Sequence, residues 1–210
     1  DGAFWFGEGD GVRSRSVTAL DVCAHEFGHA VFEAIVQPNA RQSNVQTYAV
    51  NEHVADAFAL FTERSLLNES RGWNWTMGEE VILRGTRGVM RDMANPHLLG
   101  MPDHYSEVRG DNDQHDNACV LNKFLYLWIR GGVHPQSGRI VNGMTRALGG
   151  DAERAFGMAR DSYYRTLDDL TPAVCFRLFR NALYAELLRS YGPTSEAYKQ
   201  ARAAFAAIGL

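Results

Sequence analysis

The chain lacks several features that would assign it to a broad class of proteins. Its 210 residues carry 21 basic and 25 acidic side chains, a net charge of −4, with no run of lysine or arginine. This balance argues against a general nucleic-acid surface. No apolar stretch is long enough to cross a bilayer. The first residues show no signal-peptide pattern, which a processed chain would also lack.

Cysteine is scarce as well. Cys23, Cys119 and Cys175 are widely spaced, and none belongs to a CxxC pair. The sequence therefore predicts neither a thiolate zinc site nor a disulfide framework. We expect the three side chains to be buried as small apolar groups, and unpaired thiols favour a reducing compartment.

Helix signals dominate the chain after a short extended start. Residues 1–11 combine an Ala-Phe-Trp-Phe run with a turn rich in Gly and Asp, which indicates an extended segment. Helices are predicted over residues 19–36, with Thr18 as the cap, and over residues 50–67. Further helices are predicted over residues 116–130, 138–148, 152–167, 172–191 and 195–208. The predicted fold class is mainly α, a helical lobe with a small extended or β remnant at its N-terminal end.

Residues 25–29 read His-Glu-Phe-Gly-His, the most informative pattern in the chain. On a helix, His25 and His29 leave the same face about 6 Å apart along the axis. Two ring nitrogens at this spacing can converge on one zinc ion. Glu26 points about 100° away from His25, where a base acting on zinc-bound water belongs.

Two histidines leave a catalytic zinc one protein ligand short. Glu33 lies about 12 Å along the axis from His25, which is too far to share the ion. Glu52 lies near the start of the next predicted helix, and an antiparallel helix pair would bring it to the open side of the metal. Asp56, one turn further on, can accept the second ring N–H of a ligating histidine.

These motifs, with several others in the same order, resemble the thermolysin-like metallopeptidases over almost the whole chain. The family pattern HExxH followed by NExxxD corresponds to residues 25–29 and 51–56. The other matching blocks are Ala-Phe-Trp at 3–5, Arg-x-Met-x-x-Pro at 91–96, Pro-Asp-His-Tyr-Ser at 102–106, the histidine loop at 111–115, Asn-Lys at 122–123 and Tyr-Gly-x-Thr-Ser at 191–195. Blocks in the right order are far more specific than the pentapeptide alone.

The resemblance implies a role for each matched residue of the centre. It implies that His25, His29 and Glu52 ligate zinc, that Glu26 is the general base, and that Asp56 is the outer partner of His25.

For the substrate, the resemblance implies that His115 hydrogen-bonds the developing oxyanion and is oriented by Asp111 or Asp113. It implies that Arg91 binds a peptide carbonyl beyond the scissile bond. The segment containing Ala3 and Trp5 corresponds to the edge strand that pairs with the substrate backbone.

Two further sets of residues fall on family positions. The pocket for the side chain after the cut corresponds to Val22, Met77, Val81 and Met90, which implies a preference for a bulky apolar residue. The calcium ligands correspond to Asp21, Glu63 and Glu79. Asn74 and Thr76 replace acidic ligands there, so at most one calcium site of the usual pair is expected.

Plainer roles remain open for several of these residues. His115 can be an exposed loop histidine, Arg91 an ion-pair partner of Asp56, and the three calcium candidates a solvated acidic cluster. We expect His53 to be a surface or packing residue. We expect His97, His104 and His134 to serve loops structurally.

The chain also departs from the family pattern. Most of the β-rich N-terminal lobe has no counterpart, so a minimal natural enzyme, a processed product and a truncation all remain open. Gly2 stands where the family usually has asparagine. The interval from His29 to Glu52 is about three residues longer than usual, which leaves open whether Tyr48 replaces the family's transition-state tyrosine.

The predicted function is a zinc-dependent endopeptidase, in which Glu26 activates a zinc-bound water, and zinc and His115 stabilise the oxyanion. A catalytically weak or inactive zinc-binding remnant that acts through protein interaction is the alternative. A domain whose zinc serves only folding would need four protein ligands rather than three. An aminopeptidase would need an acidic amine-binding motif, which we do not find.

The expected cofactors are Zn²⁺ and one Ca²⁺. The expected partners are peptide or protein substrates, without nucleic acid or a membrane span, and a propeptide or the missing lobe. Residues 1–68 are expected to hold the edge strand and the zinc-binding helix pair, and residues 69–210 the helical lobe, in one compact catalytic domain. Family habit implies secretion, whereas the cysteines favour a cytoplasmic protein or an exported effector.

Overall fold

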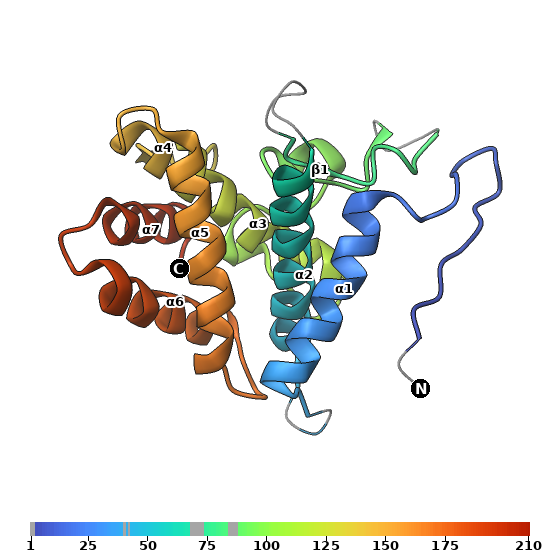
Figure 1. Ribbon diagram of the computed structural model, residues 1–210, viewed down its shortest axis with the longest axis horizontal. Coiled ribbons are helices and arrows are strands. Elements are labelled where there is room, and N and C mark those ends of the chain that lie inside the picture. Colours follow the sequence, from blue (N-terminus) through green and yellow to red (C-terminus); the bar gives the residue numbers. More distant parts are fainter. Residues whose placement is uncertain (1–2, 40, 42, 68–73, 84–87) are drawn as a thin grey trace.

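Helices dominate the computed structural model of the chain, which describes residues 3–39, 41, 43–67, 74–83 and 88–210 (Figure 1). The helices are α1 (Leu20–Val36), α2 (Val45–Leu66), α3 (Gln114–Arg130), α4 (Met144–Ala147), α5 (Ala152–Thr166), α6 (Phe176–Tyr191) and α7 (Glu196–Ala207). Short 3-10 helices are η3 (Pro96–Leu99), η4 (Tyr105–Glu107) and η5 (Leu167–Asp169). The antiparallel strand pairs are β1 (Thr76–Met77) with β2 (Arg91–Asp92), and β3 (Gly132–Val133) with β4 (Ile140–Val141). The mainly α prediction is confirmed.

Helix α2 is the centre of the fold. It packs against α1 and α3, and it also contacts α5 and α6, which with α7 form a second group of helices (Figure 1). Side chains on several sides of α2 are buried, among them Val50, Val54 and Phe61. Aromatic rings from the second group and from α3 fill the adjoining core, where Phe124 stacks on Phe205. The burial of these large rings holds α3 and the second group of helices together.

A close approach of α1 to α2 depends on Gly28, which lies between the two histidines of the HEFGH motif. A Cβ atom added to Gly28 would lie 2.8 Å from the Cα of Ala55. Normal carbon contacts are about 3.5–4.0 Å, so a larger residue would push the helices apart. The small residues at these two positions let the two helix backbones lie close together.

Two helix starts differ from the prediction. Helix α2 begins five residues earlier than predicted, at Val45, because the Asn44 side chain accepts from the backbone N–H groups of Gln46 and Thr47. The Asn44 backbone N–H in turn donates to the Thr47 hydroxyl oxygen, which completes a capping box. Helix α1 has Ala19 as its N-cap residue, with no side-chain cap, so the prediction of Thr18 as the cap was wrong.

Two predicted helices are shorter in the structure. Residues 138–148 form β4 and the single-turn α4, because Gly138 and Gly143 have φ angles of 66° and 76°, outside the helical range. Helix α6 begins at Phe176 rather than at residue 172, since the Thr171-Pro172 pair belongs to a turn. The remaining predicted helices agree with the structure to within about two residues at each end.

The predicted N-terminal edge strand is not paired in the structure. Residues 3–10 have no regular secondary structure, and the Trp5 side chain is 92% exposed. The segment lies apart from the helices in Figure 1. It is anchored further along, where Ser14 forms an isolated bridge with Ile82. A single extended segment needs a neighbouring strand to form a sheet, and the described residues provide none for residues 3–10.

The structure also shows how far the cysteines are buried and whether any helix could span a membrane. Cys119 is buried, whereas Cys23 and Cys175 are half-buried, and the three thiols are free of disulfides. Of the three cysteines that we expected to be buried, only Cys119 is fully buried. Within the described ranges, none of the helices is both long and apolar enough to pass through a membrane.

Candidate metal and catalytic site

Three potential metal ligands from α1 and α2 meet at one point. The Nε2 atoms of His25 and His29 are 3.0 Å apart. Oε2 of Glu52 lies 3.3 Å from Nε2 of His25 and 3.4 Å from Nε2 of His29. These two helices make the most extensive helix–helix contact in the fold, and Gly28 lies at its closest point. The structure therefore brings together the three side chains that the resemblance assigned to zinc.

The spacing of the donor atoms fits a tetrahedral metal ion. Zinc bonds of about 2.0–2.1 Å place neighbouring ligand atoms about 3.3–3.4 Å apart in a tetrahedron. Oε2 of Glu52 is buried, and its near neighbours are the Nε2 atoms of His25, His29 and His115 at 3.2–3.4 Å. A buried carboxylate is costly unless positive charge lies beside it, which a bound cation would supply. Two imidazole nitrogens and this oxygen are ligands that zinc accepts, so the residues fit the ion.

Each of the three candidate ligands has a second polar atom, which contacts a neighbouring side chain. Nδ1 of His25 lies 2.7 Å from Oδ1 of Asp56, and Nδ1 of His29 lies 3.0 Å from Oδ1 of Asn51. These contacts place the ring proton on Nδ1 and leave Nε2 free to ligate a metal. The amide of Gln114 donates to Oε1 of Glu52 at 2.9 Å and leaves Oε2 for the ion. Asn51 and Gln114 were not assigned these roles from the sequence.

The carboxylates change the pKa of the ligands. Burial lowers the pKa of His25, but the hydrogen bonds with Asp56 and Glu52 outweigh this effect and raise it to about 9. Burial raises the pKa of Glu52, but the neighbouring imidazoles of His25 and His29 lower it to about 2. Metal binding requires a neutral imidazole, so an ion that binds at neutral pH must displace a proton from His25.

Asp56 connects the metal ligands to Arg91. The guanidinium donates from Nε to Oδ2 of Asp56 at 2.7 Å and from a terminal nitrogen to Oδ1 at 2.6 Å. Both side chains are buried. Burial raises the pKa of Asp56, but Arg91 and His25 together hold it far below its usual range. The ion pair that the sequence left open for Arg91 is present, and it places Arg91 behind His25.

A chain of buried hydrogen bonds fixes Asp56 from the other side. Asn122 donates its amide to Oδ2 of Asp56 at 2.7 Å, so its oxygen faces Nδ1 of His53, also at 2.7 Å. Nε2 of His53 lies 2.8 Å from the Tyr163 hydroxyl. Burial lowers the pKa of His53 to about 4, which keeps the ring neutral. His53 is thus a packing residue, as one of its two expected roles states, and it also orients the Asn122 amide.

His115 faces the same centre from the start of α3. Its Nε2 lies 3.2 Å from Oε2 of Glu52. Its Nδ1 lies 2.6 Å from Oδ1 of Asp113, which also accepts the backbone N–H of His115 as the cap of α3. Backbone and side-chain hydrogen bonds from His115 lower the pKa of Asp113. The orienting contact comes from Asp113, and in the described part of the chain Asp111 makes no bond to this ring.

Glu26 is half-buried on α1, next to the first histidine, and Phe27 beside it is 60% exposed. Of the predicted pocket residues, Val22, Met77 and Val81 are buried and Met90 is half-buried. The backbone N–H of Met90 donates to the carbonyl of Met77, which joins two of these residues. Tyr48 is 43% exposed, Ala3 lies with Trp5 in the unpaired segment, and Gly2 lies outside the described residues.

The predicted calcium residues gather around Asn74. The Asn74 amide donates to Glu63 and to Glu79, and Thr76 donates to Glu79 at 3.2 Å. Asp21 instead accepts the backbone N–H groups of Val22 and Gly78. Burial and the charges of Glu79 and Asp21 raise the pKa of Glu63 to about 7. Close carboxylates repel one another in this way when no cation lies between them.

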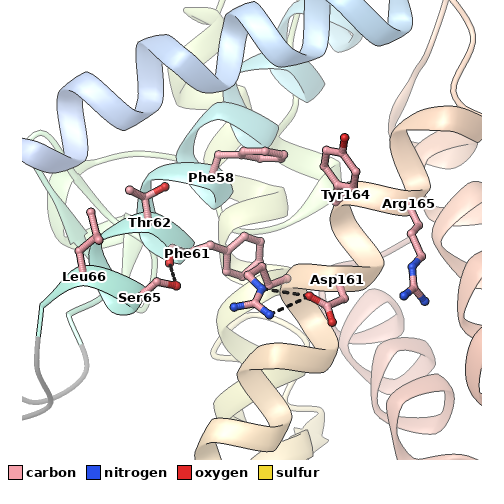
Figure 2. Close-up of a pocket in the computed structure, with 9 residues that line it drawn as sticks. Phe58, Phe61, Thr62, Ser65, Leu66, Asp161, Tyr164 and Arg165 are labelled. Atoms are coloured by element: carbon pink, nitrogen blue, oxygen red, sulfur yellow. Dashed lines mark hydrogen bonds and ion pairs between the residues drawn. The ribbon is translucent and has the colours of Figure 1, made fainter.

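A cavity of about 630 Å³ lies away from this centre, between α2 and α5 (Figure 2). Phe58, Phe61 and Leu66 from α2 face Tyr164 across it, and Arg160 pairs with Asp161 at its edge. It contains none of the predicted site residues. The candidate site is therefore the convergence of α1, α2 and the start of α3 rather than this cavity.

Comparisons with known proteins agree with the geometry. The family model of the thermolysin metallopeptidase alpha-helical domain matches residues 43–210, and that of the thermolysin metallopeptidase catalytic domain matches residues 1–33. The chain is 32% identical to thermostable neutral protease NprT of Geobacillus stearothermophilus, and 31% identical to thermolysin of Alicyclobacillus acidocaldarius subsp. acidocaldarius. Each alignment covers 99% of this chain and 37% of the relative.

Bacillolysin of Brevibacillus brevis is 30% identical over 99% of the chain and 38% of its own length. The chain thus spans little more than a third of these relatives. The match nevertheless runs from its first residues to its last, through both family models. The chain belongs to the thermolysin family of metallopeptidases.

Proposed function

We propose that the chain is the catalytic part of a zinc endopeptidase and that residues 1–210 act as one catalytic domain. The observation that carries this proposal is the convergence of the Nε2 atoms of His25 and His29 on the buried Oε2 atom of Glu52, close to tetrahedral spacing. Three protein ligands are typical of catalytic zinc, whereas structural zinc has four. When bound there, zinc supplies Lewis-acid chemistry: it lowers the pKa of water and polarises a carbonyl.

Glu26 is the general base of the proposed reaction. It takes a proton from the attacking water as the oxygen bonds to the peptide carbonyl carbon. It then passes that proton to the amide nitrogen as the C–N bond breaks, so one water is consumed for each peptide bond cut. Its position on α1, one residue after His25, supports this role because the base and the metal ligand move together.

His115 stabilises the negative charge that develops on the attacked carbonyl oxygen. Asp113 accepts the proton of Nδ1, so His115 can donate from Nε2 only as an imidazolium. The Asp113 carboxylate stabilises that charge and holds the ring toward the metal ligands. A single donor of this kind contributes about 10²–10³ to kcat.

Arg91 binds a substrate carbonyl in this proposal, with Asp56 holding its guanidinium in place from behind. Val22, Met77, Val81 and Met90 form the pocket for the side chain after the cut, which favours a bulky apolar residue. Ala3 and Trp5 pair with the substrate backbone once a neighbouring strand orders the segment. A propeptide or the β-rich N-terminal lobe of the family is the partner that would provide such a strand.

Glu26→Gln tests the proposed function, with Glu33→Gln as the matched control on the exposed side of the same helix. We expect E26Q to bind as much zinc as the wild type and to lose at least about 100-fold in the rate of cleavage of an unfolded protein. E33Q should keep both zinc and activity. Cleavage by E26Q at the wild-type rate would refute the assigned mechanism.

The alternative is a zinc-binding protein that acts through interaction rather than catalysis. The unpaired segment at residues 3–10, with Trp5 exposed, favours it because the strand that would hold substrate is not formed. This alternative predicts stoichiometric zinc with no chelator-sensitive cleavage by the wild-type chain. The same assay therefore separates the two functions.

We propose that Glu63 and Glu79, with Asp21 beside them, take one calcium ion. The raised pKa of Glu63 supports the proposal, since a divalent cation would relieve the repulsion between these carboxylates. We further propose an extracellular location, from family habit. The free thiols of Cys23, Cys119 and Cys175 keep a cytoplasmic protein or an exported effector as the alternative.

A further inference from the structure

A second group of metal-ligand side chains lies between Arg91 and His115 in the sequence. His97 is in η3, Glu107 is in η4, and Asp103 lies in the segment that joins them. Nε2 of His97 is 3.2 Å from each oxygen of Glu107 and 3.5 Å from Oδ1 of Asp103. One ligand atom from each residue lies within 4.8 Å of the other two. Imidazole and carboxylate groups at this spacing can share one ion.

Asp103 provides an independent sign that a cation belongs here. The residue is 1% exposed, and within the described ranges its Oδ1 atom has no hydrogen-bond partner. His134 lies 3.3 Å away, but Ser137 donates its backbone N–H to Nδ1 of that ring. The proton of His134 is therefore on Nε2, and it is donated to the backbone carbonyl of Asp103 at 2.9 Å. A buried carboxylate oxygen is left with the ring nitrogens of His97, at 3.5 Å, and His134 near it, and a bound cation would stabilise its charge.

The side chains of Glu107 and His97 are also placed where they could bind a metal ion. Oε2 of Glu107 accepts the backbone N–H groups of Asp103 at 3.0 Å and His104 at 3.2 Å, so its carboxylate is fixed beside Asp103. The Lys123 ammonium donates to the carbonyl of Ala94, which leaves the carboxylate pair without a direct lysine bond. His97 is exposed and can give up the contact with Glu107 to an ion.

We propose that His97, Asp103 and Glu107 form a second binding site, for a divalent transition-metal ion such as zinc. One imidazole and two carboxylates satisfy zinc, whereas calcium prefers a full set of oxygen ligands. The site adjoins a cavity of about 420 Å³, so water can complete the coordination. The cavity is lined by His97, Gly100, Met101, Pro102, Glu107, Arg109, Asn112 and Asp116. A bound ion would tie η3 to η4 and fix the segment between Arg91 and His115.

Titration calorimetry with Zn²⁺ tests this site in the whole chain. The protein is first loaded with one equivalent of zinc, and excess calcium is present to fill oxygen-only sites. We expect the wild type to bind one further equivalent. His97→Asn should weaken that second binding at least about tenfold, since loss of an outer-shell partner alone costs about 10–100-fold. His104→Asn is the matched control: Asn keeps the η4 cap that His104 supplies, and binding should not change.

The ring resonances of His97 in the wild type give a second measurement that does not depend on the folding of a variant. They should shift with the second equivalent of zinc and not with the first. Binding of only one equivalent in total would overturn the proposal. So would a second equivalent whose affinity is the same in H97N and which leaves the His97 resonances unchanged. In both cases, His97 and Glu107 form a plain ion pair.

Discussion

Gly28→Ala tests whether the close contact of α1 with α2 creates the zinc site. The added Cβ atom would lie 2.8 Å from the Cα of Ala55, about 1 Å inside a normal carbon contact. The nearest atoms are the Cα and Cβ atoms of Ala55 and the Cβ atom of Phe58. Because these atoms cannot move without the backbone of α2, the two helices must separate. Glu52 is three residues before Ala55 on α2, and it moves with that helix away from His25 and His29.

The expected effects on stability and on zinc affinity differ in size. Overpacking costs about 1–3 kcal/mol, but replacing a helical glycine returns about 0.5–1 kcal/mol. A separation of about 1 Å would move Oε2 of Glu52 from 3.3–3.4 Å to more than about 4 Å from the imidazole nitrogens, beyond tetrahedral spacing. We therefore expect zinc affinity to fall at least about tenfold, with a smaller loss in the free energy of unfolding.

Competition titration with a zinc chelator measures the affinity, and urea unfolding of the metal-free protein measures the stability. Gly157→Ala in α5 is the matched control, since nothing lies within 4 Å of a Cβ added there. It should raise stability by about 0.5–1 kcal/mol and leave zinc affinity unchanged. Wild-type zinc affinity in G28A would refute the argument that this helix contact sets the ligand geometry.

Three further predictions concern the surroundings of the site. Replacing His115 with Gln should lower kcat about 10²–10³-fold, with zinc binding as in the wild type; unchanged kcat would contradict its role. Asp56→Asn should weaken zinc about 10–100-fold and destabilise the fold by about 3–5 kcal/mol, because Arg91 stays buried without its partner; equilibrium unfolding and zinc titration should both change. In calcium-free buffer, Glu63 binds its proton more tightly in the folded state, where its pKa is about 7, than in the unfolded state, where it is 4.5. The protonated side chain therefore adds to the free energy of unfolding below pH 4.5, and this contribution is lost as the pH rises through 7. After a discount for exposure it is about 1–2 kcal/mol, and the difference in unfolding free energy between wild type and E63Q should be flat with pH if Glu63 is not shifted.

The sequence predicted the convergence of His25, His29 and Glu52, because these positions follow from helix geometry. The spacing of His25 and His29 requires only a regular helix, and α1 is regular from Leu20 to Val36. To place Glu52 near the two histidines, we also needed the direction of the second helix, which the family pattern implied. The contacts of Asn51 and Asp56 with the two histidines then follow from the same α1–α2 packing.

Other parts of the site depend on contacts between distant segments, which have no periodic signal. Gln114 reaches Glu52 from α3, and Tyr163 reaches His53 from α5. Gly28 had a detectable signal, a glycine inside a strong helix, which often marks close packing. The helix predicted over residues 138–148 is limited to Met144–Ala147, because Gly138 and Gly143 have positive φ angles outside the helical range. The edge strand predicted at residues 3–5 does not form in the structure, because a strand needs a second strand to pair with and residues 3–10 have none among the described residues.

Anomalous diffraction at the zinc edge, from crystals of the zinc-loaded protein, tests the central claim most directly. A strong peak is expected about 2.0–2.1 Å from Nε2 of His25, Nε2 of His29 and a carboxylate oxygen of Glu52. A peak bound by the two histidines, with the Glu52 carboxylate well beyond bonding distance, would contradict the proposed catalytic zinc site.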